Sequence, residues 1–310
     1  MTRHFLRDDD LTPPEQATVL ALAARMKADP FAFVTLDGPK TVALLFDKPS
    51  TRTRVSFAAG VAELGGQPLV IDAATSQLGR GETVEDTARV LQRQVAAIVW
   101  RTFAQARLES MAAVSSVPVV NALTDEFHPC QLLADLLTVT ERRGTLAGLT
   151  LSYVGDGANN MAHSTLLAGA TAGMHVRIGS PTDAAPHPSV VARAAEIAVE
   201  TGGSVLHTDV PDEAFDGADV VSTDTWVSMG QEAEVIDREA VFRPFAVTPS
   251  ALAAASPDVV VLHCLPAYRG KEIDACFVDD PASPIWDQAE NRRHVQKALL
   301  TYLFSPEAQP

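Results

Sequence analysis

The sequence predicts an α/β protein with two domains, each a mostly parallel sheet flanked by helices. Short apolar runs alternate with longer amphipathic stretches along the 310-residue chain, as expected when strands and crossover helices follow one another. Several runs are continuous Val, Ile and Leu segments, which are typical of parallel strands buried on both faces. A chain of this length suits about two domains of ordinary size.

The first predicted element is a helix that begins after Thr12. Pro13 would take the first helical position, and Glu15 stands three residues after Thr12, which is the spacing of a capping box. Apolar residues then recur at helical spacing, and they are Val19, Leu20, Ala23 and Met26.

Short apolar runs after this helix are predicted to be strands. They are Thr41–Phe46, Pro68–Ile71, Val95–Trp100, Pro118–Asn121, Thr150–Val154, His175–Ile178, Val205–His207, Asp219–Ser222 and Val259–Leu262. Helices are predicted over Gln131–Thr140 and over about Gln288–Phe304. We expect a boundary near Glu141–Gly148, with residues 1–142 as the first domain and 143–287 as the second. The C-terminal helix, in residues 288–310, is expected to dock back on the first domain.

Composition excludes several classes of protein. The net charge of −15, from 39 acidic and 24 basic residues, disfavours nucleic acid, whose binding depends on clustered Lys and Arg. No apolar run approaches the roughly 18 residues that a membrane span needs, and the first ten residues do not read as a signal peptide. The cysteines are Cys130, Cys264 and Cys276. An odd number without a Cys-x-x-Cys pair indicates a reducing cytoplasm rather than a disulfide framework.

Polar clusters follow the predicted strands, at the carboxyl ends where open α/β sheets bind ligands. The clusters are Ser50–Arg54, Arg101, His128–Gln131, Asn159–Asn160, Asp224 with Ser228–Gly230, and His263–Pro266. One such coincidence means little, but their recurrence in both halves of the chain predicts a single ligand cleft between two domains.

The first cluster has the features of an anion site. Pro49 would stop the strand and Ser50 would cap the next helix, whose exposed N–H groups and positive dipole end attract a negative charge. The guanidinium of Arg52 matches phosphate geometry, whereas Arg54, two residues further along the helix, would turn away and serve the structure. The alternative is a helix start that is merely capped and charged.

Individual residues of the other clusters have ordinary interpretations as well. Asp224 would suit an ammonium group, but a lone Asp after a strand is more often a cap or turn residue. His128 would ordinarily be a polar residue before a helix, and Cys264 a small buried hydrophobe.

Two sharper alternatives also have to be weighed. His128 with Cys130, and His263 with Cys264, suggest zinc. Adjacent strand residues point to opposite faces, however, and no Cys-x-x-Cys or His-x₃-His spacing occurs, so we expect no metal. Gly155-Asp156-Gly157 after a strand suggests a dinucleotide loop and a nicotinamide dehydrogenase, but Asn160 stands where the third glycine belongs.

Taken together, the clusters resemble the aspartate/ornithine carbamoyltransferase family. The resemblance is carried by Ser50-Thr51-Arg52-Thr53-Arg54, His128-Pro129-Cys130-Gln131, Asp224 with Ser228-Met229-Gly230, and His263-Cys264-Leu265-Pro266. Their order and spacing are similar over nearly the whole chain, up to Glu290-Asn291-Arg292. Each segment alone is moderately specific, whereas the ordered set is highly specific and outweighs the ordinary interpretation of each residue.

The resemblance implies a first domain for carbamoyl phosphate and a second for the amino acid, with no metal and no organic cofactor. The implied reaction carbamoylates the side-chain amine of L-ornithine and yields L-citrulline and phosphate. The same reversible chemistry serves arginine synthesis and breakdown, and we expect synthesis because it is the commoner setting. An inactive relative would be expected to lack some of Arg52, Arg101, His128 and Cys264, all of which are present.

For carbamoyl phosphate, the resemblance implies a phosphate cradle and partners for the carbonyl oxygen and the amino group. The implied residues are Ser50, Thr51, Arg52 and Thr53 for the phosphate, Arg101 and His128 for the carbonyl oxygen, Gln131 and the backbone of Leu265 for the amino group, and Arg292 and Cys264 beside them. Gln77 lies in a loop that, in the family, reaches the site of a neighbouring subunit. A homotrimer with shared sites is therefore implied.

For ornithine, the resemblance implies a second set of residues. Asn160, Ser228 and Met229 would recognise the α-amino and carboxylate end, and Asp224 and Cys264 would hold the amines. The implied catalytic residues are Arg101, His128, Asp224 and Cys264. An aspartate-specific member needs cationic residues in the second domain, whereas this chain presents Asp224, Ser-Met-Gly and a cysteine there. The Ser-Met-Gly segment also argues against N-acetylornithine and putrescine as substrates.

Overall fold

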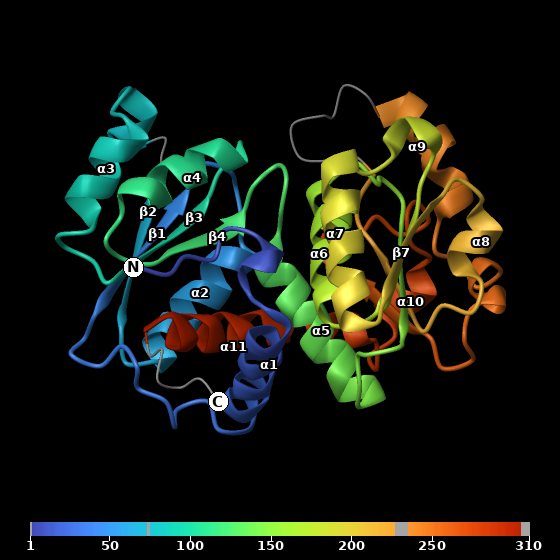
Figure 1. Cartoon of the computed structure of the whole chain (residues 1–310), viewed down its shortest axis with the longest axis horizontal. Coiled ribbons are helices and arrows are strands. Elements are labelled where there is room, and N and C mark those ends of the chain that lie inside the picture. Colours follow the sequence, from blue (N-terminus) through green and yellow to red (C-terminus); the bar gives the residue numbers. More distant parts are fainter. Residues whose placement is uncertain (1, 73–74, 227–234, 305–310) are drawn as a thin grey trace. The chain divides into compact units, whose positions relative to one another are not determined.

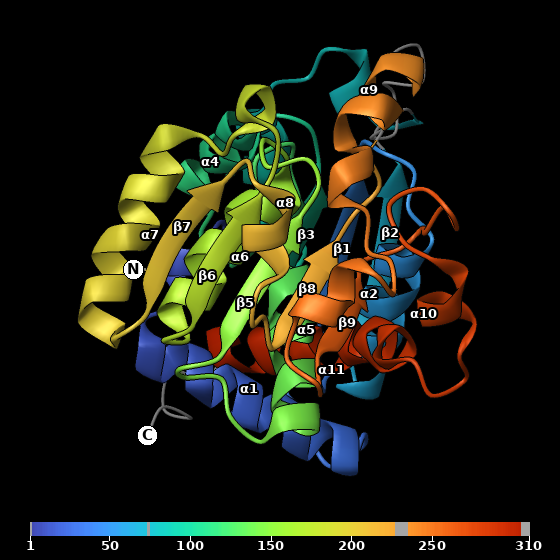
Figure 2. The ribbon, with the colours of Figure 1, turned by 90° about the vertical axis from the view of Figure 1, so that its right-hand side faces the viewer.

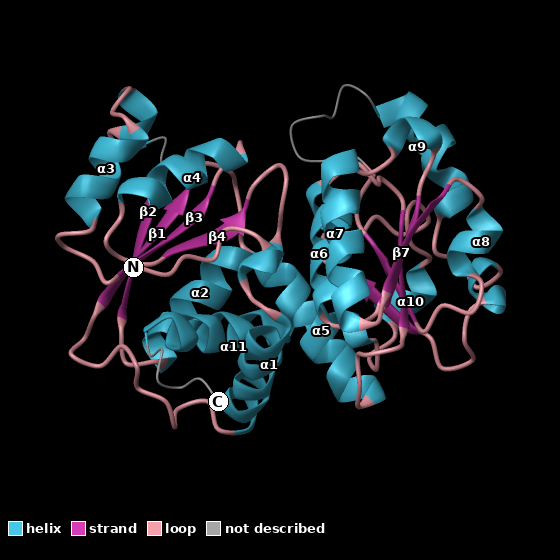
Figure 3. Ribbon diagram, in the orientation of Figure 1, coloured by secondary structure: helices cyan, strands magenta, loops and turns pink. Residues whose placement is uncertain are grey.

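The computed structural model describes residues 2–72, 75–226 and 235–304. The chain divides into two compact units, Met1–Leu137 with Glu290–Pro310, and Thr138–Ala289. Each unit is a parallel sheet with helices on its faces (Figures 1 and 3), so the predicted fold class is confirmed. The division falls within two helices, α5 (Pro129–Arg143) and α11 (Pro284–Phe304).

The sheet of the first unit has the strand order β2-β1-β3-β4, and all its pairs are parallel. Its strands are β1 (Thr41–Phe46), β2 (Gln67–Asp72), β3 (Ala97–Arg101) and β4 (Val119–Leu123). The chain moves one way from β1 to β2 and then the other way through β3 to β4. The border between β1 and β3 is therefore the topological switch point, at whose carboxyl end ligands bind in open α/β sheets.

Helices cover both faces of this sheet (Figure 1). Its helices include α2 (Arg52–Glu63), α3 (Val84–Leu91) and α4 (Gln105–Val114). On the face of α3 and α4, Leu45 and Trp100 of the strands are buried together with Leu108 of α4. The opposite face lies against α2. Burial on both faces explains the continuous apolar strands of the sequence.

Helix α1 (Pro13–Ala28) has the predicted N-terminus. Glu15 Oε2 accepts a hydrogen bond from Thr12 N at 2.8 Å, and the capping box between Thr12 and Glu15 is complete. The same carboxylate accepts from Arg3 Nη2 at 2.6 Å. The four apolar residues predicted for the inner face of this helix are all buried.

Replacing Glu15 with Gln should therefore destabilise the fold modestly. The Arg3 hydrogen bond is the main reason that the pKa of Glu15 lies at about 2 instead of 4.5. Such a carboxylate stabilises the fold above its unfolded pKa, and this contribution is lost as the pH falls from 4.5 toward 2. Because the pair is partly exposed to solvent, we expect a loss of about 1 kcal/mol or less. Urea unfolding of both forms at pH 7 and pH 3 measures it, and the difference between them should shrink at pH 3.

The C-terminal helix belongs to the first unit from Glu290 onward, as predicted. The ammonium group of Lys297, which is fully buried, donates to Glu63 Oε2 of α2 at 2.7 Å. Asn291 Oδ1 accepts from Lys27 of α1 at 2.8 Å. These bonds fix α11 against the first two helices, so residues near the end of the chain can reach the start of α2.

The second unit contains a parallel sheet with the order β7-β6-β5-β8-β9, which Figure 2 shows from left to right. Its strands are β5 (Thr150–Val154), β6 (His175–Gly179), β7 (Ser204–Thr208), β8 (Val220–Thr223) and β9 (Val260–His263). The topological switch point here lies between β5 and β8.

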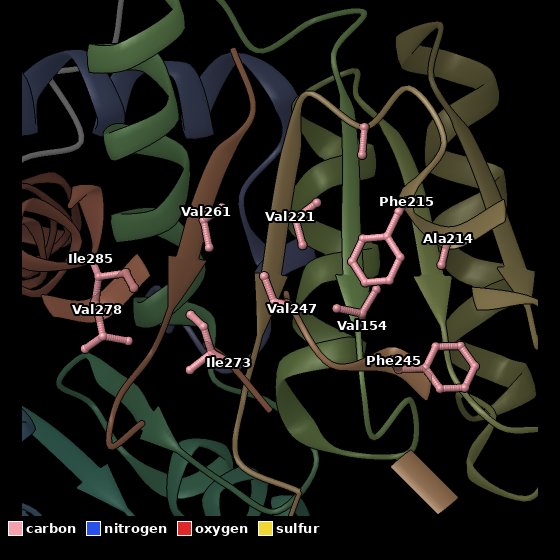
Figure 4. Packing of buried hydrophobic residues seen from close by; sticks show 11 residues of the cluster. Val154, Ala214, Phe215, Val221, Phe245, Val247, Val261, Ile273, Val278 and Ile285 are labelled. Carbon is pink, nitrogen blue, oxygen red and sulfur yellow. The ribbon is translucent and has the colours of Figure 1, made fainter. Parts of the chain in front are cut away.

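Helices α6 (Asn160–Thr171) and α7 (Pro188–Thr201) cover one face of the second sheet, and α8 (Pro211–Phe215) covers the other (Figure 1). Val154, Val221 and Val261 of neighbouring strands point into the core beside Phe215 (Figure 4). A side chain at Gly169 of α6 would place its Cβ 2.6 Å from Val176 of β6, so glycine permits this close packing. The remaining helices are α9 (Val235–Phe242) and α10 (Ala275–Asp279).

Each predicted strand is confirmed, with boundaries shifted by at most two residues. Two small shifts concern the polar clusters. Arg101 and His263 are the last residues of β3 and β9 rather than the first residues after them. Within the described part of the chain, no helix combines the length and the apolar character that crossing a membrane requires.

Candidate active site

In the first unit, the predicted polar clusters lie at the carboxyl ends of β1, β3 and β4. Helix α2 begins at Arg52, so its backbone N-cap is Thr51 and not Ser50 as predicted. Ser50 Oγ nevertheless accepts from Thr53 N at 3.3 Å, which is the capping bond expected of it. The donors at this helix start therefore combine backbone N–H groups, hydroxyls and the guanidinium of Arg52.

Arginines gather around His128. Burial is the main reason that the pKa of His128 lies well below its ordinary value of 6.5, and the positive charges of Arg292, Arg101 and Arg52 lower this pKa further. These charges come from α11, β3 and α2, which are distant in sequence. His128 is therefore neutral at physiological pH, in surroundings that attract an anion.

Two of these arginines are held in a buried setting. Arg292 Nη2 donates to Thr53 Oγ1 at 2.6 Å, and both residues are almost inaccessible to solvent. Arg101 is also buried, and the register between β3 and β4 shifts at this residue. Thr53 thus joins the start of α2 to α11.

Gln131 lies in the first turn of α5 and is buried. Its Nε2 donates to Asp135 Oδ1 at 2.8 Å, one turn further along the helix. Asp135 was not among the residues predicted from the sequence. The signal available was the i,i+4 spacing of two polar residues within the otherwise apolar segment 129–137.

Arg54 and Gln77 occupy different surroundings. Arg54 forms an ion pair with Asp72 of β2, and its guanidinium lies over the ring of Phe46. These contacts fit the structural role predicted for it. Gln77 is exposed and precedes a short 3₁₀ turn, Leu78–Arg80. Its predicted function in a neighbouring subunit stays a prediction.

In the second unit, Asp224 follows β8 and Cys264 follows β9, its neighbour in the sheet. The Cys264 thiol donates to Asp224 Oδ1, with the sulfur 3.0 Å from the oxygen. Burial is the main reason that the pKa of Asp224 is raised above 3.8. The ionised form of a carboxylate in such surroundings is stabilised by a nearby ammonium group, which replaces the interactions with water that burial removes.

His263 holds the chain that follows it. Its Nδ1 accepts from Leu265 N at 2.8 Å, so Nε2 carries the proton and faces Glu272 Oε1 at 3.2 Å. Leu265 has a φ of 59°, a left-handed conformation that costs free energy in a residue with a side chain. The histidine therefore helps to fix the strained backbone at Leu265, which the resemblance implied as a partner of the carbamoyl amino group.

Asp224, His263 and Cys264 bring potential metal-ligand atoms within 4.8 Å of one another. His263 and Cys264 therefore do not point apart as predicted, because β9 ends at His263 and the chain turns there. Both ring nitrogens of His263 are already used by Leu265 and Glu272. The prediction of no metal remains a prediction, and the histidine offers no lone pair in this arrangement.

The two adjacent asparagines at the start of α6 have different positions in the helix. Asn159 caps the helix through Ala162 N, and its Nδ2 donates to Tyr153 Oη at 2.8 Å. Asn160, the predicted ligand residue, is the first residue of the helix and is half-buried. Burial, and then the charge of Asp224, raise the pKa of Tyr153 and keep its hydroxyl protonated. Nothing in the sequence distinguished Tyr153 from the other apolar strand residues.

The predicted Ser228 and Met229 lie outside the residues that the structure describes. The described residues therefore form two sets, each within one unit. The first contains Ser50, Thr51, Arg52, Thr53, Arg101, His128, Gln131 and Arg292, and the second contains Asn160, Asp224, Cys264 and Leu265.

The fold is thus two α/β units, one with arginines gathered around His128 and the other with a carboxylate beside a thiol. Residues 3–141 match the carbamoyl-P binding domain of the aspartate/ornithine carbamoyltransferase family, and residues 147–303 match its Asp/Orn binding domain. The chain belongs to this family and is an enzyme of the transferase class.

Individual relatives are similar over almost the full chain. The ornithine carbamoyltransferase of Mycobacterium ulcerans is 62% identical over 304 residues, which cover 98% of this chain and 99% of that one. The ornithine carbamoyltransferase of Renibacterium salmoninarum is also 62% identical, with the same coverage. Among solved structures, the ornithine carbamoyltransferase from Pyrococcus furiosus has a TM-score of 0.91 and 45% identity, covering 96% of each chain.

Proposed function

We propose that the protein transfers the carbamoyl group of carbamoyl phosphate to the side-chain amine of L-ornithine, giving L-citrulline and phosphate. The observation that carries this proposal is the gathering of Arg52, Arg101 and Arg292 around a neutral His128. The chain as a whole has a net charge of −15, so three arginines gathered in one place indicate a binding site for a small anion. The names of the relatives support ornithine as the acceptor.

In this proposal carbamoyl phosphate binds first. Its phosphate lies at the start of α2, on Ser50, Thr51, Arg52 and Thr53, with Arg292 beside them and Gln77 supplied by a neighbouring subunit of a homotrimer. Arg101, His128 and Thr53 donate to the carbonyl oxygen and stabilise the oxyanion of the tetrahedral intermediate. Gln131 and the backbone of Leu265 accept from the carbamoyl amino group.

Ornithine lies against the second set of residues. Asp224 and Cys264 hold the amine, while Asn160, with Ser228 and Met229, recognises the α-amino and carboxylate end. The amine attacks the carbonyl carbon, the bond from that carbon to the phosphate oxygen breaks, and the departing phosphate accepts the proton of the amine. No strong protein base is needed, and no metal or organic cofactor takes part.

The physiological setting is proposed as arginine synthesis in the cytoplasm. The three cysteines are free thiols, which fits a reducing compartment. One structural relative, from Campylobacter jejuni, is described as an anabolic ornithine carbamoyltransferase and is 36% identical. A host that lacks its own ornithine carbamoyltransferase cannot grow without arginine or citrulline. Growth of this host on medium free of both, with and without the gene for this protein, tests whether the enzyme works in the direction of synthesis.

The choice of acceptor tests the proposal directly. A citrulline assay with carbamoyl phosphate should show turnover with ornithine and far less with N-acetylornithine, putrescine or aspartate. Aspartate should be the poorest acceptor, because its second carboxylate would meet the negative charge of Asp224. Preferred turnover of aspartate would overturn the assignment within the family.

Activity should rise with pH between 6 and 9. A free alkylamine has a pKa of about 10.4, so near pH 7.4 only about one molecule in a thousand is ready to attack. At the acid end, the raised pKa of Asp224 means that its carboxylate becomes neutral at a higher pH than an ordinary Asp. Both effects reduce activity at low pH. A flat profile of kcat/KM for ornithine over this range would contradict attack by the neutral amine.

A further inference from the structure

A buried pair on α5 fixes the orientation of an amide in the first unit. Gln131 and Asp135 are 1% and 3% exposed, and Gln131 Nε2 lies 2.8 Å from Asp135 Oδ1. The backbone N–H of Gln131 also donates to His128 O at 3.0 Å, which ties this turn to the histidine among the arginines. The pair is thus part of the surroundings proposed for carbamoyl phosphate.

The carboxylate determines which end of the amide faces it. An ionised carboxylate has only acceptors, whereas a glutamine amide has two donors on nitrogen and acceptor lone pairs on oxygen. The amino end of Gln131 therefore faces Asp135, and the oxygen end is directed elsewhere. Gln131 Oε1 is buried and has no hydrogen-bond partner within the described part of the chain. A buried carbonyl oxygen in this state gains when a ligand brings an N–H group to it.

We propose that Asp135 is a positioning residue that makes the enzyme select carbamoyl phosphate over acetyl phosphate. This inference rests on the proposed function. The two phosphates have nearly the same shape and charge, but acetyl phosphate has a methyl group where carbamoyl phosphate has NH₂. With the amide fixed by Asp135, Gln131 Oε1 accepts from that NH₂, while a methyl group leaves the oxygen without a donor. Asp135 contributes this selection through Gln131 without touching the substrate.

The first variant is Asp135→Asn, which keeps the shape and adds a donor. The new amide can donate to Gln131 Oε1, so the glutamine can turn its amino end toward the ligand. We expect carbamoyl phosphate binding, measured by titration calorimetry without ornithine, to weaken roughly tenfold. Acetyl phosphate binding should change little, so the ratio of the two dissociation constants should fall.

The second variant exchanges the two groups, as Gln131→Glu with Asp135→Asn. The carboxylate at position 131 then accepts from the amide at position 135 and again presents an acceptor oxygen to the ligand. The net charge of the pair is unchanged. We expect this exchange to recover part of the preference that Asp135→Asn loses. A purely structural role of Asp135 predicts no such recovery, so thermal unfolding of both variants is recorded beside the binding constants.

The outcomes separate the inference from the proposed function. An unchanged ratio in Asp135→Asn, or no recovery in the exchanged pair, would overturn the positioning role while leaving carbamoyl transfer in place. If the unaltered enzyme bound carbamoyl phosphate and acetyl phosphate equally, the selection itself would be refuted. If it bound neither, both the proposed function and this inference would fail.

Discussion

Replacing Arg52 with alanine should weaken carbamoyl phosphate binding at least tenfold and leave the fold intact. Arg52 is the first residue of α2, is half-buried, and is one of the charges that lower the pKa of His128. Loss of one charged hydrogen-bond partner costs roughly 1.5–3 kcal/mol, and about 1.4 kcal/mol corresponds to tenfold. The KM for carbamoyl phosphate in a citrulline assay measures the effect, with circular dichroism to check the fold.

Arg54 offers a matched control two residues away. It is on the same helix, but it pairs with Asp72 and stacks on Phe46. Arg54→Ala should leave the KM for carbamoyl phosphate within about twofold, since an exposed ion pair contributes only about 1 kcal/mol or less to the fold. If the two variants changed this KM equally, the effect would come from total charge and Arg52 would lose its place in the cradle.

The same substitution of Arg52 should also change His128. Arg52 is one of three positive charges that lower the pKa of this histidine, and burial is the largest cause. Removing one charge should raise the pKa without bringing it to its ordinary value. The imidazole would stay neutral at pH 7.5, so the loss in Arg52→Ala reports on phosphate binding and not on a change in the protonation of His128.

The strands were the most predictable part of the fold. The run Thr41–Phe46 is apolar at every position after the first, and its bounds agree with β1. The reason is that a parallel strand buried on both faces is apolar along its length, so the polar residues that flank it mark its ends. The capping box at Thr12 was predictable because it depends on residues three apart in the sequence.

Contacts between distant residues were not predictable in the same way. Arg292 and Thr53 are separated by 239 positions, and their hydrogen bond appears only when α11 packs beside α2. His263 and Cys264 illustrate a local failure, since strand alternation stops where the strand ends. Asp135 and Glu272 were not predicted, because neither belongs to a recognisable motif. Asp135 contacts Gln131, and Glu272 contacts His263.

The two topological switch points, one in each sheet, carry side chains of opposite charge. The first collects guanidinium groups around His128, while the second half-buries the carboxylate of Asp224. Burying a charge costs free energy unless a partner restores what water supplied. A site that holds such a charge is therefore stabilised when its ligand binds. In the free protein, we expect the residue that carries the charge to lower the free energy of unfolding.

Asp224→Asn tests this expectation, because it should harm ornithine use and stabilise the fold at the same time. Loss of one partner of a buried charge pair costs about 2 kcal/mol or more, so kcat/KM for ornithine should fall at least about thirtyfold. Burial raises the pKa of Asp224 in the folded state. The folded protein therefore holds this proton more tightly than the unfolded chain, and the ionised carboxylate destabilises the fold once the pH passes both pKa values.

The sign of the stability effect follows from that linkage. Above pH 3.8, toward the raised pKa, the contribution of Asp224 to stability falls as the pH rises, and the asparagine substitution removes this loss. The unfolding midpoint of Asp224→Asn at pH 7 should therefore lie above that of the unaltered protein, and the gap should narrow near pH 4. Calorimetric unfolding scans at both pH values measure it, while the KM for carbamoyl phosphate stays nearly constant.

Asp219, just before the same strand β8, provides the control with the opposite sign. It pairs with Arg143 at 3.0 Å and accepts from Thr150 N at 2.9 Å, so its negative charge is used within the fold. Asp219→Asn should lower the unfolding midpoint and leave ornithine kinetics unchanged. If Asp224→Asn also lowered the midpoint, Asp224 would be a structural charge like Asp219. If it altered only carbamoyl phosphate affinity, the roles proposed for the two units would be reversed.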